Sequence, residues 1–210
     1  MGSRGSSPVR GRPFVPDGRA THDRARIAQV AAKLIAEHGI ADWSLAKRKA
    51  ARSLMLPDRV ALPGDDEVAA ALVEYHALFG GDAHAATLRA QREEALRWMR
   101  RLHEFAPLLT GGVAAGWATE HSDIRLELVA NDAKLVELAL LNAGVAYRAM
   151  HSDRDGAAEL FVESPRGGLR LSVRAPADAR QRPRHDRHGN EELRLDAEAV
   201  ATLLGEQVNK

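Results

Sequence analysis

The sequence predicts an α+β fold in which a mixed or antiparallel sheet is flanked by helices and preceded by a helical segment. Two observations lead to this fold class. Up to about residue 105, apolar residues recur at i, i+3 and i+4, which is the spacing of amphipathic helices. Beyond that point, apolar and polar residues alternate in several short runs, as they do in strands that are buried on one face.

Composition and charge narrow the class of protein. Of the 210 residues, 45% are hydrophobic and 28% are charged, proportions that are typical of a globular protein. The formal net charge of +1 gives no general attraction to nucleic acids or anionic membranes. The absence of cysteine excludes disulfides and thiolate chemistry. No apolar run approaches the roughly 20 residues of a membrane helix, so we expect a cytoplasmic protein without membrane contact.

Shifts in composition divide the chain into three parts. Residues 1–21 are rich in Gly, Ser, Pro and Arg, and we expect them to form a disordered basic tail. Residues 22–81 form the predicted helical segment, and residues 84–210 form the predicted sheet domain.

Start and stop signals define three helices in the helical segment. The first begins at Asp23 and ends before Gly39, and the second is capped by Asp42 or Ser44 and ends near residue 56. The third extends from residue 65 to residues 80–81, where a glycine pair stops it. Its apolar face consists of Val68, Leu72, Tyr75 and Phe79.

The second helix is basic, and its cationic residues are Lys47, Arg48, Lys49 and Arg52. A helix, a Gly-Ile pair and a capped basic helix resemble the start of the helix-turn-helix domain of tetracycline-repressor-like regulators. Such a domain needs a recognition helix after a short turn, but Pro57, Pro63 and Gly64 occupy that region. We therefore predict that the basic residues are exposed and that nucleic acid is not a partner.

A fourth helix is predicted from about residue 84 to 105. Its apolar stripe consists of Leu88, Ala95, Leu96, Met99 and Leu102. Its flanks are predicted to carry the charged residues Arg89, Arg92, Glu93, Arg97, Arg100 and Arg101. This helix leads into Leu108 and Leu109, the start of the stretch that carries the candidate site.

In that stretch, Gly111 and Gly112 permit a tight turn that can approach a phosphate. A turn at His121 and Ser122 precedes a strand whose apolar face holds Ile124, Leu126 and Leu128. The other face of this strand holds Asp123, Arg125, Glu127 and Val129. Beyond it we predict a helix capped by Asp132, strands at residues 145–150, 159–163 and 169–173, and a final helix at residues 196–204.

This order of motifs resembles the core of the polymerase-β-like nucleotidyltransferase superfamily, in which a Gly-Gly or Gly-Ser pair precedes a Ser-Asp-x-Asp strand. The resemblance implies a nucleotidyltransferase-like fold. It also implies that Gly111, Gly112 and Ser122 bind the phosphates of a nucleoside triphosphate, and that Asp123 is a catalytic carboxylate that binds Mg²⁺.

Two positions depart from this family pattern. The second carboxylate of the motif falls at Arg125, whose cation repels a metal ion and can pair with Asp123 or with a phosphate. Glu127 lies on the same face, but about 13 Å farther along the strand, as a weak second metal ligand. The resemblance implies a third carboxylate on a later strand, but the polar positions of the matching strand hold Arg170 and Ser172. Glu159 or Glu163 on the neighbouring strand would have to supply this carboxylate.

These departures lead to three interpretations. The first is a catalytically degenerate member of the superfamily that binds a nucleotide or a protein partner, with Arg125 in place of metal charge. The second is an active, Mg²⁺-dependent nucleotidyltransferase that uses Asp123 and Glu127. The third is a DNA-binding regulator, which the missing recognition helix argues against. The first interpretation is also compatible with a protein that binds no cofactor.

Overall fold

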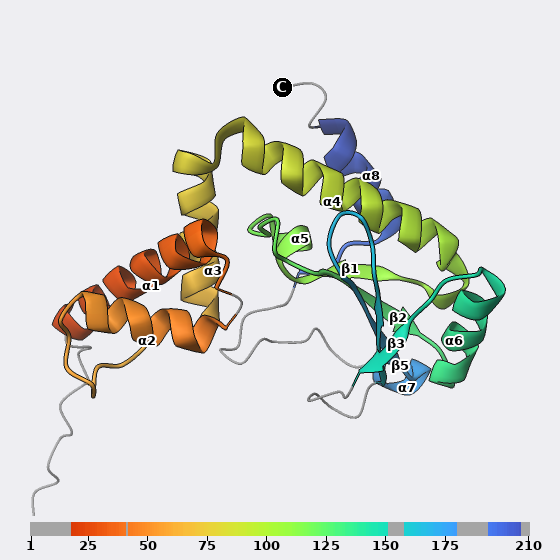
Figure 1. Ribbon diagram of the computed structural model, residues 1–210, viewed down its shortest axis with the longest axis horizontal. Coiled ribbons are helices and arrows are strands. Elements are labelled where there is room, and N and C mark those ends of the chain that lie inside the picture. The colour runs from red at the N-terminus through yellow and green to blue at the C-terminus, as the bar shows by residue number, and fades with distance from the viewer. Residues whose placement is uncertain (1–17, 41, 151–157, 180–192, 207–210) are drawn as a thin grey trace, which may run out of the picture.

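The computed structural model describes residues 18–40, 42–150, 158–179 and 193–206. It is an α+β structure in which a helical segment is joined by a long helix to a sheet (Figure 1). The α-helices are α1 (Gly18–His38), α2 (Trp43–Ser53), α3 (Asp65–Tyr75), α4 (Gly81–Arg101), α5 (Gly111–Ala115), α6 (Ala133–Asn142), α7 (Pro176–Ala179) and α8 (Ala197–Glu206). The strands are β1 (Leu108–Thr110), β2 (Ile124–Val129), β3 (Arg148–Met150), β4 (Ala158–Val162) and β5 (Leu169–Arg174).

Helix α1 begins at Gly18, earlier than the predicted start at Asp23, so the last residues of the predicted tail are helical. Residues 1–17 of that tail lie outside the described residues. The helix ends as predicted, because Gly39 has a φ of 62°, a conformation that stops an α-helix.

Asp42 caps helix α2, because its Oδ1 accepts the N–H of Leu45 at 3.0 Å. The helix ends at Ser53, before the predicted end near residue 56. Apolar residues of α1, α2 and α3 form one buried cluster, which includes Ile27, Ala31, Ala46, Val68 and Leu72.

The prediction that all four basic residues of α2 are exposed is wrong for Lys47, whose exposed fraction is only 8%. Its Nζ donates to the carbonyl oxygen of Pro63 at 3.1 Å and to Oδ1 of Asp65 at 2.7 Å. These two acceptors satisfy the buried ammonium, and they fasten α2 to the start of α3. Arg48, Lys49 and Arg52 are exposed, as predicted.

The third and fourth helices are closer together than predicted. A π-helical turn, His76–Gly80, follows α3 directly, and α4 begins at Gly81. The wider π-helical turn rotates the following residues away from the face that carries Val68 and Leu72. Phe79, which was predicted on the same helix face as Val68 and Leu72, is consequently 71% exposed and does not extend their buried surface. Gly81 has a φ of 51°, and the chain changes direction there, as Figure 1 shows.

The described strands form a five-stranded mixed sheet in the order β1-β2-β5-β4-β3. Strands β2 and β5 are parallel, and the other neighbours are antiparallel. The predicted strand at residues 145–150 is shorter in the structure and begins at Arg148. The residues before it bind α6 instead, since Val145 donates its N–H to Leu140 and Tyr147 donates its hydroxyl to Glu137.

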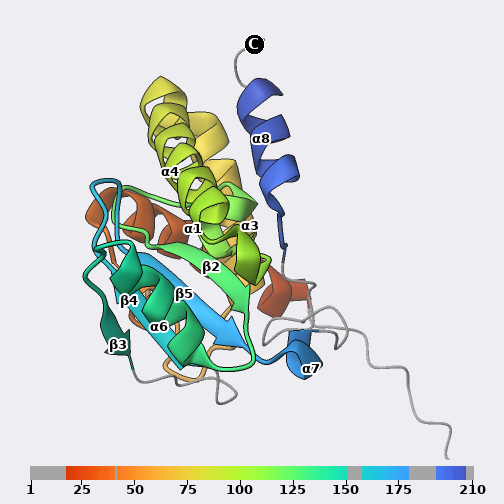
Figure 2. The ribbon, with the colours of Figure 1, turned by 90° about the vertical axis from the view of Figure 1, so that its right-hand side faces the viewer.

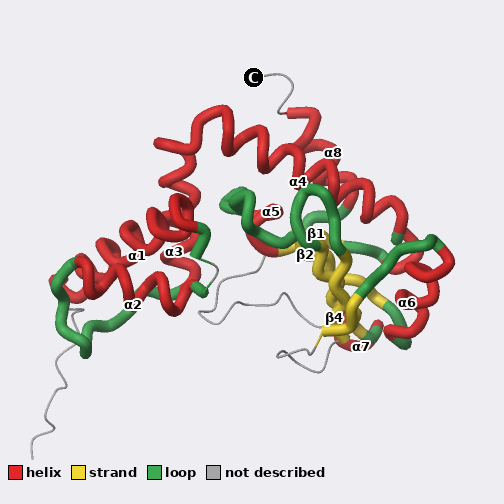
Figure 3. The backbone as a smooth tube through the Cα atoms, in the orientation of Figure 1, coloured by secondary structure: helices red, strands yellow, loops and turns green. Residues whose placement is uncertain are grey.

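One face of the sheet is apolar and packs against α4, α6 and α8. The buried cluster includes Ile124, Leu126 and Leu128 of β2, as the alternation predicts, together with apolar residues of these helices. Figure 2 shows α6 against the strands and α8 beside α4, and Figure 3 shows the same helices at the sheet end of the molecule. The opposite face is polar and carries the candidate site. In the part of the chain that the structure describes, no helix combines the length and apolar character needed to cross a membrane.

Candidate functional site

The antiparallel pairing of β1 with β2 brings the glycine pair next to the start of β2, as predicted. Thr110, the last residue of β1, pairs with Arg125 in an antiparallel register, and Gly111 follows it. Gly111 has a φ of 68°, and a Cβ there would lie 3.1 Å from the Cδ of Arg125. Glycine therefore allows the backbone to turn directly beside the Arg125 side chain.

Gly112 has a packing role that the sequence did not indicate. A Cβ at Gly112 would lie 2.6 Å from Cζ3 of Trp117, so the indole ring lies directly on the glycine. The carbonyl oxygen of Gly112 also accepts the N–H of Trp117 at 3.0 Å. Trp117 in turn contacts Trp43 of α2, with the ring centroids 4.8 Å apart. Gly112 thus helps to hold the helical segment against the loop of residues 116–122.

Ser122 stabilises the turn that precedes β2. Its Oγ accepts the N–H of Thr119 at 2.9 Å, and the carbonyl oxygen of Thr119 accepts a hydrogen bond from Gln91 of α4 at 2.9 Å. His121 lies in this turn, as predicted, and its ring lies against Gly39. The structure therefore gives Ser122 a local role in positioning Asp123.

Asp123 forms an ion pair with Arg170, whose Nε donates to its Oδ2 at 2.6 Å. The sequence offered Arg125 as a partner either for Asp123 or for a phosphate, whereas the cation that pairs with Asp123 in the structure is Arg170. The parallel register explains the difference, because Ile124 pairs with Leu169 and Arg125 with Arg170. Arg170 therefore lies close enough to reach back to the start of β2.

Glu127, the predicted second metal ligand, is buried between two cations. Its Oε2 lies 3.0 Å from Nε of Arg174 and 3.5 Å from a terminal nitrogen of Arg194. Both predicted metal carboxylates thus have arginine neighbours, and a metal ion at either one would have to compete with a guanidinium. Within the described ranges, no three side chains of His, Asp or Glu converge as a metal-binding group.

A row of arginines crosses the polar face of the sheet. Arg125 pairs with Arg170, Arg170 pairs with Phe161, and Phe161 pairs with Arg148, so these four side chains lie on the same face. The guanidinium carbon of Arg148 lies 5.1 Å from the centre of the Phe161 ring. We call Arg125, Arg148 and Arg170 the arginine row. Arg148 was not singled out from the sequence, because its strand is short and without clear alternation.

The two acids considered as replacements for the third carboxylate, Glu159 and Glu163, have different neighbours on this side of the sheet. Glu163, one of the two replacements considered for the third carboxylate, is exposed and pairs with Arg148 at 3.0 Å. Glu159, the other, lies opposite Ser172 in the antiparallel register of β4 and β5. An exposed pair such as Arg148–Glu163 contributes about 0–1 kcal/mol, so an incoming anion can displace its carboxylate.

No protein-family model matches the chain, and no curated protein matches it significantly.

Proposed function

We propose that the sheet domain is a nucleotidyltransferase-like domain without metal chemistry, which binds the phosphates of a nucleoside triphosphate on the arginine row. One observation carries this proposal: Arg125 stands beside the Gly111 turn and opposite Arg170, which already pairs with Asp123. Guanidinium groups thus stand where the family motif would bring carboxylates and a metal ion together.

Arginine suits this role because its planar guanidinium donates two parallel hydrogen bonds to a phosphate. Arg125 is exposed on the sheet and lies against the glycine turn. Arg170 on β5 is its direct neighbour in the row, and Arg148 on β3 brings further positive charge on the far side of Phe161. A chain of phosphates laid across the strands would therefore meet successive cations.

Binding without Mg²⁺ follows from the ion pairs of the two acids. Opposite unit charges about 4 Å apart attract by roughly 4 kcal/mol at an effective dielectric constant near 20. Mg²⁺ also releases its waters reluctantly and requires oxygen ligands in octahedral geometry. Asp123 is already paired with Arg170, and Glu127 with Arg174. These carboxylates therefore compete poorly with water as ligands of Mg²⁺.

The test is calorimetric titration of the native chain and of Arg125→Gln with each nucleoside triphosphate in the presence of EDTA. The matched control is Arg48→Gln, which removes the same charge from an exposed position on α2. We expect Arg125→Gln to weaken binding about tenfold, the effect of one charge-assisted hydrogen bond. Equal affinities of the native chain and Arg125→Gln would overturn the proposal.

A further inference from the structure

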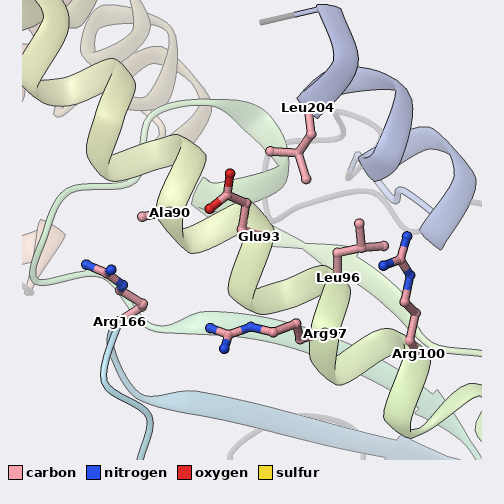
Figure 4. Close-up of a pocket in the computed structure, with 7 residues that line it drawn as sticks. All are labelled: Ala90, Glu93, Leu96, Arg97, Arg100, Arg166 and Leu204. Carbon is pink, nitrogen blue, oxygen red and sulfur yellow. The ribbon is translucent and has the colours of Figure 1, made fainter. Parts of the chain in front are cut away.

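A second group of arginines lines a pocket on the helical side of the sheet. The pocket, about 410 Å³ in volume, lies between α4, α8 and the loop of residues 163–168 (Figure 4). Figure 4 shows Arg97 and Arg166 at one end of the pocket and Arg100 at the other, beside α8. Leu96 and Leu204 provide an apolar surface between these ends.

Two of these cations lack a countercharge. Within the described ranges, neither Arg100 nor Arg166 forms an ion pair or a side-chain hydrogen bond. The pocket acid, Glu93, is paired with Arg89 at 3.0 Å. Arg97 pairs with Glu94 but remains largely exposed. Each end of the pocket therefore has a guanidinium available to an anion.

The loop that carries Arg166 is fastened to α4 beneath the pocket. Buried Glu94 accepts a hydrogen bond from the indole Nε1 of Trp98 at 2.9 Å and another from Ser164 Oγ at 2.6 Å. Since Ser164 belongs to the same loop as Arg166, these bonds hold the two sides of the pocket together. An anion that draws Arg97 away from Glu94 would also change the surroundings of the Trp98 indole.

We propose that this pocket binds a small molecule that carries a phosphate group at each end of an apolar body. The two ends with their arginines select two anionic groups, and the leucines select the apolar part between them. Phosphates are favoured over single carboxylates because each phosphate carries a charge between about −1.5 and −2 and has more oxygen atoms that accept hydrogen bonds from the arginines. This site is separate from the arginine row, because α4 packs on the apolar face of the sheet.

The test uses hexane-1,6-bisphosphate as the probe and hexyl phosphate as its single-anion counterpart, in calorimetric titrations with EDTA. We expect the native chain to bind the bisphosphate about tenfold more tightly than the monophosphate. We expect Arg100→Gln/Arg166→Gln to remove this preference. The charge-matched control, Arg48→Gln/Arg52→Gln, and the row variant Arg125→Gln should each keep it.

The proposal would be overturned by no binding to the native chain, by an equal affinity for both probes, by an unchanged preference in Arg100→Gln/Arg166→Gln, or by loss of the preference in the control pair. The last would mean unspecific attraction of anions. Loss of the preference for the bisphosphate in Arg125→Gln would place this probe on the arginine row. That result would also overturn the proposal of a separate site. Tryptophan fluorescence, to which Trp98 contributes together with Trp43 and Trp117, should change with the same midpoint as the calorimetric signal. Circular dichroism verifies that each variant is folded.

Discussion

Arg170 donates from Nε to Oδ2 of Asp123 over 2.6 Å and joins the start of β2 to the second residue of β5. This ion pair determines the charge that the polar face of the sheet presents at Asp123. A carboxylate that would otherwise attract a cation is neutralised within the protein, and Arg125 stands beside it as the next cation of the row.

Placing an acid at position 125, where the resemblance implies a second carboxylate, should create a metal site. In Arg125→Asp/Arg170→Gln, two acids at i and i+2 of β2 point to the same side, and Asp123 has lost its cation. We expect Mn²⁺, followed by electron paramagnetic resonance, to bind about tenfold more tightly than to the native chain. The control, Arg125→Gln/Arg170→Gln, removes both cations without adding an acid. Equal Mn²⁺ affinities in these two variants would contradict the role of the carboxylate pair.

Gly112→Ala should destabilise the fold, because its Cβ would lie 2.6 Å from the Trp117 ring. Such overpacking costs about 1–3 kcal/mol, to be measured as the free energy of unfolding in urea. Gly205→Ala in α8 is the control, since a Cβ there meets nothing within 4 Å. We expect it to be neutral or slightly stabilising, because alanine favours helices. A loss of stability in both variants alike would mean that the Trp117 contact is not the cause.

Lys47→Ala should lower the free energy of unfolding by about 1–3 kcal/mol, since it removes hydrogen bonds of a charged group to Pro63 and Asp65. Lys49→Ala, on the exposed side of the same helix, should change it by less than about 0.5 kcal/mol. Equal effects of the two substitutions in urea denaturation would show that the buried ammonium contributes nothing specific.

The strands and most helix ends could be predicted because their signals are local. Ile124, Leu126 and Leu128 alternate with polar residues, and Asp42 and Asp132 cap the helices that follow them. The place of the glycine pair beside β2 was predicted instead from the family resemblance. Ion pairs between distant strands were not predictable, since Arg170 and Asp123 are 47 positions apart and meet only through the order of the sheet.

Buried cations were also beyond prediction from the pattern of polar residues. Arg92 was expected on the flank of α4, but it is buried and donates from Nε to the carbonyl oxygen of Val113 at 3.1 Å. Lys47 is buried for a similar reason. An amphipathic pattern does not distinguish an arginine in solvent from one that reaches a carbonyl of another element.

Acid should destabilise the junction between α3 and α4. The rings of His76 and His84 stack at 3.6 Å, and His84 Nε2 lies 3.3 Å from the carbonyl oxygen of Gly116. Burial, followed by the charge of His84, lowers the pKa of His76 from 6.5 to about 4. Burial also lowers the pKa of His84.

Because the unfolded chain binds these protons more readily, stability is complete above pH 6.5 and is lost as the pH falls toward about 4. His76→Gln, compared with the native chain at pH 7 and pH 5 in urea, should lose less stability between the two pH values. The matched control is His103→Gln, which alters an exposed histidine and should keep the native pH dependence. An identical pH dependence in the native chain and His76→Gln would exclude the stacked pair as its source.

The central claim is that the arginine row binds nucleotide phosphates without a metal ion. Titration of the native chain with ATP, GTP, CTP and UTP, once with EDTA and once with Mg²⁺, tests it most directly. For the nucleotide that binds, we expect the two affinities to agree within about threefold, with no nucleotide transfer detected in either condition. Binding that appears only with Mg²⁺, together with transfer activity that Asp123→Ala abolishes, would contradict the claim and show an active enzyme.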